Sequence, residues 1–84
     1  MDANVIAARI EKSLGTAEVT VRDLTGTGDH FEARVVSPAF EGKSMVEQHQ
    51  LVYAGLDDVL KTGELHALAL RTFTPAAWDK AKEK

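Results

Sequence analysis

The 84-residue sequence contains no cysteine. The chain alone can therefore form no disulfide, no thiolate nucleophile and no thiolate metal site. It also lacks long apolar runs, since none approaches the roughly 20 residues that span a bilayer. Its first segment, MDANVIAARIEKSLG, carries acidic residues where a targeting segment would have basic residues and an apolar block. We therefore expect a cytoplasmic protein with no membrane partner.

The net charge and the lack of catalytic motifs bear on two further classes of function, nucleic-acid binding and catalysis. The formal net charge of −3 gives no global attraction for phosphate backbones, although a local basic patch is compatible with it. The sequence shows no pair of carboxylates in a cleft arrangement and no distinctive Ser-His-Asp spacing. A chain of this length forms one domain, residues 1–84, and such a domain rarely encloses a substrate pocket of several hundred Å3. We predict a single-domain protein that is not an enzyme.

The first half of the chain predicts a helix and a hairpin. Apolar residues recur every four positions at Ile6, Ile10 and Leu14, which is typical of an amphipathic helix, and Gly15 follows as a stop signal. Residues 17–23 and 31–36 alternate between apolar and polar side chains, and a Gly-containing turn separates them. These patterns indicate two antiparallel strands.

The second half predicts a helix, a strand and a final helix. Proline cannot continue a central strand, so the chain must turn at Ser37-Pro38. Ser44 and Glu47 have the spacing of a capping box, which predicts a long helix from Ser44 to about Thr62 with Met45, Val46 and His49 on or beside its apolar stripe. A strand over 65–73 follows, and Thr74-Pro75 begins a last helix that Trp78 would fix to the body. This order favours an α+β fold, a small sheet with helices on one side.

Two blocks in this half carry a family resemblance. The segments VVSPAFEGKSMVEQHQLVYAGL and ELHALALRTFTPAAW, in this order and spacing, resemble the BolA family, and the likeness extends over about 19–78. The resemblance implies a class II KH-like fold with a three-stranded mixed sheet, helices packed on one face and the order α-β-β-α-β-α. It also implies a heterodimer with a monothiol glutaredoxin and a bridging [2Fe-2S] cluster that the two proteins and glutathione hold together, in iron-sulfur trafficking or iron regulation.

His66 is the main candidate ligand. Taken alone, a histidine at the start of a strand is more often half-exposed and without function. In BolA-like proteins, however, the histidine of the matching HAL segment ligates the cluster iron. Such a cluster needs four ligands, usually thiolates, with imidazole as a known replacement. This chain has three histidines and no thiolate, so we expect it to hold the cluster only with a partner that supplies sulfur.

The other two histidines, His30 and His49, differ in how well they suit the role of a second cluster ligand. In BolA-like proteins a second ligand, His or Cys, comes from the loop between the first two strands. This chain departs from that pattern because its loop is short and has no Cys, which leaves His30 as the candidate by elimination, with a solvated turn residue as the other interpretation. His49 lies on the apolar stripe of the long helix, which indicates a packed or edge histidine.

A nucleic-acid-binding transcriptional regulator is the alternative function, since BolA-like proteins have also been proposed to act this way. DNA would then be the partner, with Arg34, Lys43, Ser44 and Arg71 as candidate contacts on the KH-like surface. Residues 41–44 lead into a helix start, which favours anions, although a loop with one solvated lysine is the more common case for such a segment. Residues 42–44 lack the preceding glycine of a P-loop, which excludes that motif. Without a partner, we expect a monomer or a weak homodimer.

Overall fold

The computed structural model describes residues 2–26, 30–63, 65 and 67–82. Its sheet contains β1 (Glu18–Asp23), β2 (His30–Val36) and β3 (Ala67–Phe73), with β2 in the middle. β1 pairs antiparallel with β2, and β3 pairs parallel with β2. The sheet is therefore mixed, and the predicted α+β fold and hairpin are confirmed. The helices are α1 (Ala3–Leu14), α2 (Met45–Ala54), α3 (Asp57–Thr62) and α4 (Pro75–Lys82), and a 3-10 turn spans Pro38–Phe40.

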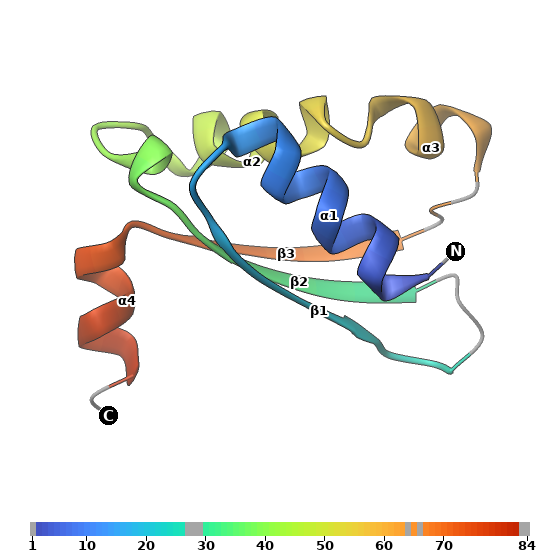
Figure 1. Cartoon of the computed structure of the whole chain (residues 1–84), viewed down its shortest axis with the longest axis horizontal. Helices are drawn as coiled ribbons and strands as arrows, with labels where there is room; N and C mark the ends of the chain where they lie inside the picture. Colours follow the sequence, from blue (N-terminus) through green and yellow to red (C-terminus); the bar gives the residue numbers. More distant parts are fainter. Residues whose placement is uncertain (1, 27–29, 64, 66, 83–84) are drawn as a thin grey trace.

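The layers follow from the alternation along β2. Phe31, Ala33 and Val35 are buried, whereas the residues between them are only half-buried. Figure 1 shows α1, α2 and α3 on one side of the sheet, and α4 leaving the end of β3 toward the other side. The core between the helices and the sheet consists of Ile6, Ile10, Phe31, Ala33, Val35, Phe40, Val52, Leu56, Val59 and Leu65. We call the side of the sheet away from this core the open face.

The start of α2 and the end of β2 form as local chemistry predicts. Ser44 Oγ accepts a hydrogen bond from the Glu47 N–H, and the Glu47 carboxylate accepts one from the Ser44 N–H at 2.9 Å. Ser37 ends β2 and is fully buried. Its hydroxyl donates to the Thr16 carbonyl at 2.7 Å and accepts from the Ala39 N–H, so no buried polar atom of this side chain is left unpaired.

The predicted long helix is broken in two, which corrects the expectation of one helix from Ser44 to about Thr62. α2 ends at Ala54, Gly55 caps it, and α3 begins at Asp57. The interruption lies at Leu56, whose φ of −121° and ψ of 7° leave the helical region, whereas Gly55 keeps helical angles. α1 crosses at this junction: a Cβ at Gly55 would lie 2.7 Å from Ser13 Cβ and 3.3 Å from the Arg9 carbonyl oxygen. Glycine permits this close approach because it has no side chain to collide with α1.

Two further expectations need correction. Met45 and Val46 were expected near the apolar stripe, but they are 57% and 66% exposed. Met45 lies at the rim, with its sulfur 3.4 Å from Thr72 Oγ1, and Val46 is turned away because each helix residue rotates by about 100°. The last strand begins at Ala67, not at Leu65. Leu65 is buried and its N–H donates to the carbonyl of Val59, so it follows α3 and bonds back to that helix, not to the sheet.

Among the helices that the structure describes, none combines the length and the apolar character needed to cross a membrane.

Candidate functional site

His30 lies at the first position of β2, at one end of the sheet. It is half-buried, and by alternation it shares the open face with Glu32 and Arg34. Its partner in the β2–β3 register is Ala67, the first residue of β3. His66, the main predicted ligand, lies outside the described residues. Its role as a ligand therefore stays a prediction, and so does that of His30.

His49 lies on α2 and is half-buried, which confirms the expected packed position. Its ring meets the edge of Tyr53, with ring centroids 6.4 Å apart and planes at 84°. Its Nε2 atom is buried, and the described part of the chain offers it no hydrogen-bond partner. His49 and Met45 line an open groove of about 310 Å3 beside β3. This position is separated from His30 by the sheet, because His30 lies on the open face and α2 covers the other.

Within ranges 2–26, 30–63, 65 and 67–82, no three His, Cys, Asp or Glu side chains come together in a way that could hold a metal ion. A groove of about 610 Å3 lies between α1 and the α2–α3 junction. It is lined by Val5, Arg9, Lys12, Ser13 and Gly55. Arg9 donates there to the Gly55 carbonyl and pairs with Asp58, which lowers the pKa of the Asp58 carboxyl through that hydrogen bond. The lining offers no histidine or carboxylate for acid–base chemistry.

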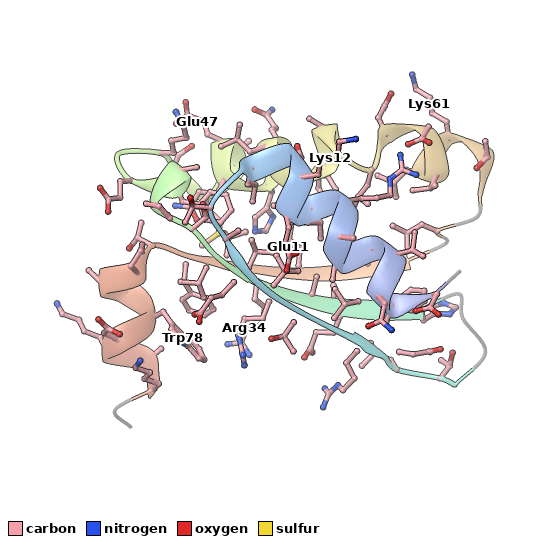
Figure 2. The ribbon with its side chains drawn as sticks, in the orientation of Figure 1. Glu11, Lys12, Arg34, Glu47, Lys61 and Trp78 are labelled. Carbon is pink, nitrogen blue, oxygen red and sulfur yellow. The ribbon has the colours of Figure 1, made fainter. Side chains whose placement is uncertain are left out.

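The basic candidates separate into two groups on opposite sides of the sheet. Arg34 of β2 and Arg71 of β3 are register partners on the open face. Lys43 and Ser44 precede α2, which lies on the helical side. Figure 2 shows Arg34 on the open side of the sheet and Glu47, from the first turn of α2, on the other. A single nucleic-acid backbone would have to pass around the sheet edge to contact both groups.

The helix start at Ser44 is already occupied by a carboxylate. Glu47 accepts the Ser44 N–H, and the hydrogen bonds from the Ser44 N–H and hydroxyl lower the pKa of Glu47. The side chain of Gln48 donates to the Lys43 carbonyl at 3.0 Å. A phosphate at this helix end would meet a negative charge where a free N–H would be needed. The geometry therefore weighs against the phosphate-binding interpretation of residues 41–44, which stays an untested prediction.

Arg34 has a contact that the sequence did not predict. Its guanidinium carbon lies 4.3 Å from the centroid of the Trp78 ring, and its Nη2 atom donates to Thr20 Oγ1 at 3.1 Å. Trp78 of α4 also packs against Phe73, with ring centroids 5.3 Å apart. Trp78 thus fixes α4 to the body, as expected, but it does so on the open face. Alternation along β2 could have placed Arg34 there, whereas no pattern in residues 74–82 predicts the direction of α4.

Comparison with known proteins places this arrangement in one family. The BolA-like protein family model matches residues 6–77. The chain is 41% identical to SufE-like protein 1 of Arabidopsis thaliana over 84% of its own length and only 23% of that protein. It is 31% identical to acid stress protein IbaG of Escherichia coli (strain K12), over 99% of this chain and 95% of that one.

The fold agrees with the sequence match. The structure of a bolA protein homologue from Coxiella burnetii superimposes with a TM-score of 0.81 at 34% identity, covering 94% of this chain and 97% of that one. The sheet topology, the structural similarity and the sequence match thus agree with one another. The chain belongs to the BolA family.

Proposed function

We propose that this chain binds a monothiol glutaredoxin and helps to ligate a bridging [2Fe-2S] cluster through histidine, as a binding protein and not an enzyme. Family membership supports the proposal, and the resemblance in the HAL segment implies His66 as the main ligand. The role would be iron-sulfur trafficking or iron regulation, in a cytoplasmic setting.

The observation that carries the proposal is the register of β2 and β3. His30 pairs with Ala67, and Ala67 directly follows His66 in the sequence. Neighbouring strands lie about 4.7–4.9 Å apart, and consecutive Cα atoms are 3.8 Å apart. The register therefore brings Ala67, the residue after His66 in the sequence, next to His30 at one end of the sheet. Two histidines at one shared cluster would both have to lie at this end.

The available donor groups support a shared cluster in preference to one held by this chain alone. The chain supplies imidazoles and no thiolate, and its described part contains no group of three metal-binding side chains. Four ligands are needed, so glutaredoxin cysteine and glutathione would contribute the sulfur. A bound cluster would supply a redox-active, transferable iron centre, and imidazole in place of thiolate raises its potential. His30 is half-buried at the sheet end, where its position is fixed by the β2 pairing.

The experiment uses the three histidines of the chain as one matched series. Wild type, His66→Gln, His30→Gln and His49→Gln are each mixed with a monothiol glutaredoxin, iron, sulfide and glutathione. Heterodimer formation is followed by gel filtration and the cluster by its visible spectrum. We expect His66→Gln to change the spectrum and to make the cluster more labile. His49→Gln is the control, because His49 lies on the helical side of the sheet.

The outcomes test three parts of the proposal separately: the function, His66 as a ligand and His30 as a ligand. If wild type forms neither a heterodimer nor a cluster, the function is wrong. A cluster that is identical in His66→Gln and wild type would remove His66 as a ligand. If His30→Gln matches wild type while His66→Gln does not, this chain supplies one ligand and the partner side supplies the fourth.

A further inference from the structure

Two arginines lie side by side on the open face. Arg34 and Arg71 are direct partners in the parallel register of β2 and β3. Both point away from the core, because the neighbours of Arg34 along β2, Ala33 and Val35, are buried on the helical side. Like charges directly opposite each other destabilise a sheet unless something compensates them.

Within the part of the chain that the structure describes, no carboxylate forms an ion pair with either arginine. Ion pairs there join Arg9 to Asp58, Arg22 to Glu32, Lys61 to Asp57 and Lys82 to Asp79, and none of these involves Arg34 or Arg71. Glu32 is the acidic residue nearest to Arg34 on the open face of β2, and it is held by Arg22 at 3.2 Å. The two guanidiniums therefore create a local positive field on a chain whose net charge is −3.

Aromatic side chains hold this pair in place. Arg34 stacks on Trp78 at 4.3 Å and donates one hydrogen bond to Thr20, so its plane is fixed before any ligand arrives. Arg71 lies over the ring of Phe73, with its guanidinium carbon 6.0 Å from the ring centroid. A guanidinium carries five N–H donors, and the contact with Thr20 uses one of them. Fixed planar donors match carboxylate oxygens and lose little entropy on binding. Figure 2 shows Arg34 and Trp78 together on the open side.

We propose that Arg34 and Arg71, backed by Trp78, form a docking site for a short acidic segment of a partner protein. The positive charge that attracts carboxylates is local, because Glu18 lies on the same face of β1 and Glu32 lies on the same face of β2. These acids would repel a polyphosphate chain that continued beyond the two arginines. Lys43 and Ser44 cannot extend the basic track, because they lie on the helical side. One or two carboxylates fit this surface, and a long nucleic-acid backbone does not.

The chain provides its own reporter for a test. Trp78 is the only tryptophan, and it lies against Arg34. The probe is a labelled hexapeptide with two adjacent glutamates among uncharged residues, and the same peptide with two glutamines is the uncharged control. Inorganic phosphate and a labelled single-stranded decathymidylate are run in parallel. Binding is measured by Trp78 fluorescence and by the anisotropy of the label, with no iron or glutaredoxin present. The outcome therefore does not depend on the cluster proposal.

Arg34→Gln and Arg71→Gln are compared with Lys43→Gln, which also removes one positive charge but lies before α2 on the helical side. We expect saturable binding of the acidic peptide, weakened about tenfold by either arginine substitution and little by Lys43→Gln; tenfold corresponds to about 1.4 kcal/mol. Far-UV circular dichroism checks the fold. Because Arg34 also packs on Trp78, Arg71→Gln keeps the test valid if Arg34→Gln alters the structure.

Three results would overturn the proposal. The peptide fails to bind, or it binds both substituted proteins as tightly as wild type. Phosphate alone competes at the same concentration as the peptide, which would reduce the site to a simple anion site. The oligonucleotide binds more tightly than the peptide with the same dependence on Arg34 and Arg71, which would assign the surface to nucleic acid.

Discussion

Gly55→Ala tests the packing that divides the helical side into α2 and α3. Gly55 has φ −78° and ψ −10°, which alanine adopts without strain. The added methyl group, however, would lie 2.7 Å from Ser13 Cβ, 3.0 Å from Ser13 Oγ and 3.3 Å from the Arg9 carbonyl oxygen. Two of these three atoms cannot move by a simple side-chain rotation. α1 must shift away from the α2–α3 junction to admit the methyl group.

The expected cost follows from two opposing effects. Extra methyl groups in packed contacts cost about 1–3 kcal/mol, whereas replacing glycine by alanine at a compatible conformation gains about 0.4–1 kcal/mol through the unfolded chain. We expect a net destabilisation of about 1–2 kcal/mol. For a domain of this size, each kcal/mol lowers the melting temperature by about 4–8 °C.

Urea unfolding of wild type, Gly55→Ala, Ser13→Gly and the double variant measures the effect as a double-mutant cycle. Ser13→Gly removes the atoms that the new methyl group meets, so Gly55→Ala should cost clearly less in that background. Two results would contradict this expectation. Gly55→Ala could be as stable as wild type, or it could lower the free energy of unfolding by the same amount with and without Ser13.

Three further predictions each concern one site, at Ser37, at Glu47 and in the loop before Ser44. Ser37→Ala should destabilise the protein by about 1–3 kcal/mol in urea unfolding, because it leaves the Thr16 carbonyl without its buried donor; an unchanged midpoint would contradict this. The capping hydrogen bonds lower the pKa of Glu47, so its charged form stabilises the fold above the unfolded value of about 4.3, and this contribution is lost as the pH falls through the lower folded value. The stability difference between wild type and Glu47→Gln should therefore be constant near neutral pH and shrink in acid, which urea midpoints from pH 7 to 3 would show. If the loop before Ser44 binds nucleic acid, affinity should fall by close to one log unit per log unit of salt for each phosphate neutralised, and Lys43→Glu should weaken it further; no binding at low salt would rule out this surface.

The features predicted correctly from the sequence depend on neighbours in the chain. The capping box needs only Ser44 and Glu47, which are three residues apart, and the end of β2 needs only the proline after Ser37. The alternation of 31–36 assigns its faces without knowledge of any other element. Such local signals determine where elements begin and which side they bury, and the family resemblance supplied the arrangement of the three strands.

The features that were missed depend on contacts between distant segments. Gly55 and Leu56 lie within a periodic apolar pattern that predicts a continuous helix, and that pattern contains no sign that α1 crosses at this point. The stacking of Arg34 on Trp78 depends on the direction in which α4 leaves β3, which no pattern in 74–82 specifies. For the candidate cluster site, sequence alone named both histidines, whereas the pairing of His30 with Ala67 required the register of β2 and β3.

Each of the two proposed surfaces includes a residue of β2, so their positions decide whether one partner can contact both. His30 and Arg34 share the open face of β2, four residues apart, which is about 13 Å along a strand. An interface of about 800 Å2 per partner is about 30 Å across, so one partner could cover both positions. In that case Arg34→Gln and Arg71→Gln should weaken glutaredoxin binding while leaving the visible spectrum of the cluster unchanged. If instead the acidic segment belongs to a different protein, these substitutions should leave the glutaredoxin complex intact, and the acidic peptide should bind the preformed complex as well as the free chain.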